Sequence, residues 1–131
     1  FMLPAGGQGA VGIECRIGEE AIEDLLDPLH CHATADCVLA ERAMNRRLEG
    51  GCQVPIGCFA IHKNQQLWLR GLVGDPDGSV ILRDEIVAPI IDSETMGTTL
   101  AEQLLAAGAG EILARVYNAD DNLVDKPGID A

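Results

Sequence analysis

Alternating apolar and polar residues predict three strands in the middle of the chain, over residues 56–62, 67–73 and 79–88. Residues typical of turns separate the strands. Lys63-Asn64-Gln65 is short enough to close a hairpin, and residues 74–78 carry the proline, aspartates and glycines of a longer connection. The three strands therefore form an antiparallel meander whose apolar face needs cover from other elements.

Apolar residues at helical spacing predict that cover. A long helix is expected over residues 33–49, ended by Gly50 and Gly51. A second helix, capped by Asp92 or Ser93, stops at Gly108, and a short third helix follows over residues 110–117. The acidic sequence after residue 118 offers little to bury, so we expect the chain to fray there.

The long helix has two contrasting faces. One is apolar and is predicted to enter the core; it carries Cys37, Ala40, Ala43, Met44 and Leu48. The other is polar and is predicted to face solvent; it carries Glu41, Arg42, Asn45, Arg46 and Glu49. The arginines fit a solvated helix face and an anion-binding role equally well.

The N-terminal region predicts a strand over residues 10–17, where β-branched and polar residues alternate, and then a short helix that ends at Pro28. No matching partner strand lies nearby in the sequence. We therefore expect this strand to be mobile or paired with another chain, and not to occupy a central position in the meander. The fold class is α+β: a three-stranded antiparallel sheet covered on one face by helices.

Composition narrows the possible functions. The 131 residues carry a net charge of −12, which opposes binding to nucleic acid. No apolar run approaches the ~20 residues of a membrane span, and no secretory signal is visible. Five cysteines without a Cys-x-x-Cys pair argue against a disulfide framework and indicate a reducing compartment, which we take to be the cytoplasm.

Two short motifs favour a structural interpretation. His30, Cys31, His32 and Cys37 have the spacing of neither a zinc ribbon nor a zinc finger, so no metal is expected. Residues 7–12 satisfy Gly-x-Gly-x-x-Gly, but a dinucleotide site needs a strand before that motif and a helix after it. The sequence predicts neither.

Cys52 is the candidate reactive thiol. It follows Gly50 and Gly51, whose lack of a Cβ lets the backbone turn tightly, and three arginines precede it, which would favour the thiolate. Cys15, in a strand, and Cys37, on an apolar helix face, are expected to be shielded. Cys58 is a second thiol near Cys52, but its alternating strand position indicates a small core residue.

Two long motifs resemble one enzyme family. Residues 40–57 read AERAMNRRLEGGCQVPIG, and residues 3–16 read LPAGGQGAVGIECR. Both resemble hydroxymethylbilane synthase, also called porphobilinogen deaminase, and they occur in the order and at the separation typical of that family. Trp68-Leu69-Arg70 and Gly108-Ala109 fit as well. Gly6, in place of a more usual apolar residue, and the extra thiol of Cys58 depart from the family pattern.

The resemblance implies a transferase of tetrapyrrole synthesis that condenses four porphobilinogens into hydroxymethylbilane and releases ammonia. Cys52 would carry the dipyrromethane cofactor as a thioether, with Gln8, Gly9, Gly50 and Gly51 near the cofactor. The chain would be the C-terminal portion of a monomeric three-domain enzyme. Residues 1–28 would be a strand and helix returning from a preceding domain, and residues 29–131 the cofactor-anchoring domain.

The same resemblance places the catalytic aspartate and most substrate-binding arginines in the other domains, so no catalytic residue is expected in this chain. A different class of function stays open. The chain could be a non-catalytic, thiol-bearing docking module held by a partner through its N-terminal strand. Whether Cys52 carries a pyrrole adduct separates the two hypotheses.

Overall fold

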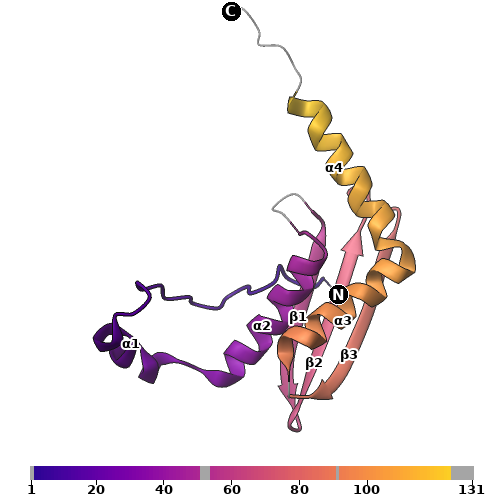
Figure 1. The fold of residues 1–131 in the computed structure, drawn as a ribbon. Helices are drawn as coiled ribbons and strands as arrows, with labels where there is room; N and C mark the ends of the chain where they lie inside the picture. The colour runs from indigo at the N-terminus through magenta and orange to yellow at the C-terminus, as the bar shows by residue number, and fades with distance from the viewer. Residues whose placement is uncertain (1, 51–53, 91, 125–131) are drawn as a thin grey trace, which may run out of the picture.

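A computed structural model describes residues 2–50, 54–90 and 92–124, with side chains as far as residue 118. Its sheet contains β1 (Ile56–Lys63), β2 (Gln66–Gly74) and β3 (Ile81–Pro89), all antiparallel and in that spatial order. The helices α2 (His32–Arg47) and α3 (Ser93–Leu104) lie side by side across one face of the sheet (Figure 1). This arrangement confirms the α+β fold class.

The two hairpins form where the turn residues predict them. Asn64 and Gln65 have φ values of 53° and 62°, as a two-residue turn that follows the strand twist requires. In the longer connection Gly78 has a φ of 77° and donates its N–H to the Asp75 carbonyl at 2.9 Å. The turns fix a register in which Phe59, Arg70 and Glu85 form one row across the sheet.

The core lies between the sheet and the two helices, and the apolar face of α2 enters it as predicted. Met44 is fully buried over Gly71, where a Cβ would lie only 2.5 Å from the Met44 methyl carbon. The glycine in β2 therefore makes room for the helix side chain. The largest fully buried side chains are those of Met44, Leu48, Leu67, Leu69, Leu100, Leu104, Val73 and Cys58.

The closest contact between α2 and α3 is at Gly97. A Cβ on this residue would lie 2.1 Å from the Ala40 carbonyl oxygen and 2.9 Å from the Ala43 Cβ. Two solvent-exposed ion pairs flank this contact, Arg46–Glu94 at 3.6 Å and Arg47–Glu102 at 2.6 Å. Exposed pairs of this kind contribute about 0–1 kcal/mol each, so backbone proximity and apolar packing dominate the helix contact.

The C-terminal helices differ from expectation in one respect. Asp92 caps α3 by accepting the Thr95 N–H at 3.1 Å, and Gly108, with a φ of 104°, marks the bend before α4 (Gly110–Val124). Fraying was expected after residue 118, but the helix continues to Val124; the rest of the predicted tail, residues 125–131, lies outside the described residues. Backbone hydrogen bonds within a helix need no burial, so an acidic sequence can extend it.

The N-terminal region forms an arm beside the main layer (Figure 1). It contains α1 (Glu20–Leu26), which has no buried residue, and the 3₁₀ turn η1 (Asp27–Leu29). The strand predicted over residues 10–17 is not formed, because these residues pair with no strand of the sheet. This agrees with the expectation that they would not occupy a central position. No helix within the described ranges has the length and hydrophobicity needed to cross a bilayer.

The Gly97 contact gives a direct test of the helix packing. Gly97→Ala should lower the free energy of unfolding by about 2 kcal/mol or more, because backbone atoms of α2 cannot yield to the added methyl group. Gly110→Ala is the matched control, since its Cβ would meet only Leu105 Cδ2 at 3.8 Å. The control should be neutral or stabilise by up to about 1 kcal/mol through helix propensity. Urea unfolding of both variants checks this, and equal stability would contradict the packing argument.

Candidate functional site

The end of α2 forms the entry to the glycine and cysteine loop. Glu49 takes a left-handed φ of 55°, Gly50 N–H donates to the Asn45 carbonyl at 2.9 Å, and Glu49 N–H donates to the Arg46 carbonyl at 3.1 Å. These two bonds are the Schellman pattern of helix termination. The sequence predicted that the glycines would end the helix, whereas the left-handed residue is Glu49, at a cost of about 1–2 kcal/mol.

Side chains from two helices hold this entry in place. The Asn45 amide donates to the Gly50 carbonyl at 3.2 Å, and a Cβ on Gly50 would lie 2.1 Å from the Asn45 side-chain oxygen. The Tyr117 hydroxyl, from α4, donates to the Glu49 carbonyl. The predicted site residue Gly50 is therefore fixed by contacts that sequence reasoning missed, since nothing near residue 50 points to Tyr117.

The exit of the loop is anchored as well. Val54 is buried, and the Pro55 carbonyl accepts the N–H of Gly74 at 2.9 Å. The predicted site residues Cys52 and Gly51 lie outside the described residues, as does Gln53. The described residues on either side, Gly50 and Pro55, are each hydrogen-bonded to a neighbouring element.

A second predicted site, Gln8, lies in a tight turn of the N-terminal segment. Gly7 and Gly9 on either side have φ values of 75° and 83°, which favour glycine. Ala10 N–H donates to the Gly7 carbonyl at 3.1 Å. The side chain of Gln8 is exposed, so it is available to a ligand or to another part of the protein.

Glu41 connects this turn to the sheet. Its carboxylate accepts the Gly7 N–H at 2.6 Å and the Ala60 N–H, on the edge strand β1, at 2.7 Å. Only 5% of Glu41 is exposed, so its predicted place on the solvent face of α2 is wrong. The sequence contained an indication of this burial. Cys37 and Met44 lie on the apolar face of the helix, and Glu41 is four residues after the first and three before the second, so it shares their side of the helix.

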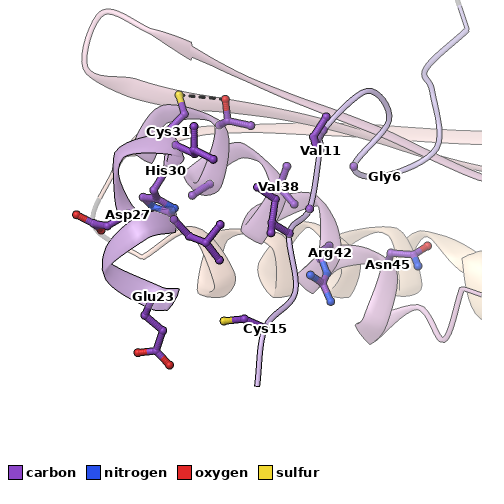
Figure 2. Close-up of a pocket in the computed structure, with 18 residues that line it drawn as sticks. Gly6, Val11, Cys15, Glu23, Asp27, His30, Cys31, Val38, Arg42 and Asn45 are labelled. Atoms are coloured by element: carbon purple, nitrogen blue, oxygen red, sulfur yellow. Dashed lines mark hydrogen bonds between the residues drawn. The ribbon is translucent and has the colours of Figure 1, made fainter. Parts of the chain in front are cut away.

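A cleft of about 790 Å³ lies between the N-terminal segment, α1 and α2 (Figure 2). Arg42 and Asn45 line it from α2, and Cys15 lines it from the extended segment. Arg42 is exposed and makes no ion pair with any residue of the described ranges, whereas Arg46 and Arg47 are paired with α3. Asn45, which lines the cleft, also donates to the Gly50 carbonyl at the entry of the cysteine loop.

The described cysteines have different environments. Cys58 is fully buried, and burial, followed by the field of Glu41, raises the pKa of its thiol to about 12. This confirms its assignment to the core. Cys31 is exposed, and hydrogen bonds from Thr34 lower its pKa, while burial raises the pKa of the partly buried Cys37. Cys15 was expected to be shielded but is exposed, because the strand predicted around it has no partner in the sheet.

In the described residues, neither the histidine and cysteine cluster at residues 30–37 nor the glycine motif at residues 7–12 is arranged as a ligand site. The rings of His30 and His32 meet edge to face at 4.6 Å, and the described part of the chain has no group of three residues suited to hold a metal ion. The segment after Gly9 is extended, and no helix begins there, so the requirement for a dinucleotide site is not met in these residues.

The fold and the loop define a class: a small α+β domain that presents a cysteine between a helix end and the edge strand of an open sheet. The family model for the C-terminal domain of porphobilinogen deaminase matches residues 35–106. The match covers more than half of the chain, and the chain belongs to this family. The matched range includes α2 from Ala35 onward, the sequence of the cysteine loop, the sheet and α3.

The thiol environments predict a reactivity order. In brief alkylation with iodoacetamide near neutral pH, Cys31 and Cys15 should react roughly a hundredfold faster than Cys58 or more, because Cys58 is buried and protonated. Peptide mass mapping assigns each site. In denaturant the difference should disappear, which is the internal control. Equal labelling of Cys58 and Cys31 in the native protein would contradict the burial of Cys58.

Proposed function

We propose that this chain is the cofactor-anchoring part of a hydroxymethylbilane synthase, in which Cys52 holds a dipyrromethane cofactor as a thioether. The observation that carries the proposal is the family match over residues 35–106, which contains Cys52 in a loop anchored at both ends. Residues 29–131 would then be the anchoring domain, and residues 1–28 would return from a preceding domain. The bound dipyrromethane supplies the pyrrole end to which new units are added.

The residues present fit an anchor better than a complete binding site. A dipyrromethane carries four carboxylates, which arginines bind well in a bidentate manner. The cleft beside the loop offers one arginine without an ion pair to the described residues, Arg42, because Arg46 and Arg47 are paired with Glu94 and Glu102. The chain therefore provides the point of attachment and one cation, and other cations must come from the preceding domains.

Attachment at Cys52 follows from simple chemistry. The Cys52 sulfur bonds to the methylene carbon of the pyrrole precursor, the carbon–nitrogen bond breaks, and the thiol proton leaves with the amine as ammonia. A thioether resists the acid and base steps that would cleave an ester, so the anchor persists between cycles. The hydrogen bonds at Gly50 and Pro55 support this role, because they tie the described residues on either side of the cysteine to the rest of the domain.

Intact mass spectrometry of the full-length enzyme tests the attachment. The wild type and Cys58→Ser should carry the mass of a dipyrromethane and react with an aldehyde reagent for pyrroles, whereas Cys52→Ser should do neither. Cys58→Ser is a suitable control because it alters a nearby but buried thiol. An adduct that persists on the Cys52 variant would move the anchor. A wild type without any adduct would favour the alternative, a docking module.

The chain alone should have no deaminase activity. Near the two motifs, Glu14 is on the exposed N-terminal segment, Glu41 is buried with both oxygens bonded to backbone N–H groups, and Glu49 ends a helix. We expect none of them to be the acid–base group, because none resembles the catalytic aspartate that the family resemblance places in the other domains. Purified residues 1–131 should consume no porphobilinogen in an assay that detects turnover by the full-length enzyme. Measurable turnover would place the acid–base group within this chain.

A further inference from the structure

On the edge strand β1, the backbone N–H groups of Cys58 and Ala60 point away from β2 and bond to other parts of the chain. The N-terminal segment satisfies the first, since the Pro4 carbonyl accepts the Cys58 N–H at 2.8 Å. The Glu41 carboxylate satisfies the second at 2.7 Å and uses its other oxygen for Gly7 N–H at 2.6 Å. Residues 3–7, here called the strap, thus cover the edge of β1.

Steric fit between the strap and β1 supports the same contact. A Cβ on Gly6 would lie 3.0 Å from the Cys58 sulfur, and a Cβ on Gly57 would lie 2.9 Å from the Leu3 carbonyl oxygen. Glycine on each side therefore permits the close approach. The two positions that depart from the family motifs, Gly6 and Cys58, face each other here, so a smaller residue on the strap accommodates a sulfur on the strand.

A buried carboxylate without a cation needs strong hydrogen bonds to offset its lost hydration. Glu41 has them in two backbone N–H groups, and bonds to a charged acceptor are worth more than neutral ones. Because the two donors come from segments 34 and 19 residues away from Glu41, the carboxylate joins α2, β1 and the strap at one point.

We propose that Glu41 is a positioning residue that fixes the turn at residues 7–9, and with it Gln8, relative to the α2 end from which the Cys52 loop departs. The structural part of the proposal concerns only the strap. Its functional part, that Gln8 is thereby held toward the cofactor, rests on the proposed function. Loss of the Glu41 charge should release the strap while α2 and the sheet stay packed.

Hydrogen exchange in the full-length protein tests the structural part. Glu41→Gln keeps the size of the side chain but turns an NH₂ group toward one of the two donors, so exchange at Gly7 and Ala60 should rise roughly tenfold or more. Glu102→Gln is the matched control, because it removes an exposed charge on α3 and should leave both amides unchanged. Unchanged exchange of the Gly7 amide in Glu41→Gln would overturn the proposal.

A second variant opens the strap from its other side. Gly6→Val should displace the strap and raise the alkylation rate of Cys58 at least about tenfold, since its side chain meets the Cys58 sulfur. Gly12→Val is the control, because a Cβ there meets no atom within 4 Å. This pair keeps the test valid if Glu41→Gln fails to fold. Equal Cys58 labelling in both glycine variants would also overturn the proposal.

A double-mutant cycle tests the functional part. If Glu41 acts through Gln8, the turnover of Glu41→Gln with Gln8→Ala should be no lower than that of Gln8→Ala alone. If the fold-losses in turnover of the two single variants multiply in the double variant, Glu41 has only a structural role, and the proposal that it positions Gln8 is overturned. A wild type that neither carries an adduct nor turns over porphobilinogen would refute the proposed function. The hydrogen-exchange experiment would still show whether Glu41 fixes the strap.

Discussion

The contact of α2 with α3 at Gly97 is the constraint on which the other features depend. Because the α3 backbone meets the Ala40 carbonyl without an intervening side chain, both helices fit over a sheet of only three strands. Met44 then reaches Gly71 and closes the core between them. This geometry fixes the rotation of α2 about its axis. Glu41 is turned toward the edge of β1, and Arg46 and Arg47 are turned toward the acidic side chains of α3.

Sequence patterns alone predicted most of the sheet and its covering helices. Alternation located the three strands to within about two residues, and the turn chemistry of Asn64 and Gly78 located both hairpins. These features are local, so a pattern in one stretch of chain contains the information. The strand predicted over residues 10–17 failed for the opposite reason. Alternation describes a side-chain pattern, whereas a strand also needs a partner for its backbone.

The candidate site was less accessible to sequence reasoning. Cys52 and its glycines were found from local chemistry and family resemblance, but some contacts around the site join residues that are far apart in the sequence. Tyr117 is 68 residues from the Glu49 carbonyl that it contacts, and Glu41 is 34 residues from Gly7. The helical spacing also assigned Glu41 to the wrong face of α2. Periodicity does not show whether another segment of the chain covers a residue that lies between the apolar and polar faces.

Cys58 shows how its position in a fold changes the chemistry of a thiol. Cys58 points from a strand into the core beneath Gly6, where lost hydration and the field of Glu41 disfavour the thiolate. The proposed anchor, Cys52, follows in the sequence a helix end that is fixed by hydrogen bonds. Of the three arginines before it, Arg46 and Arg47 pair with acidic side chains of α3. A permanent covalent anchor needs a thiol that ionises before it reacts and a backbone that does not move afterwards. The buried strand position of Cys58 fails the first requirement.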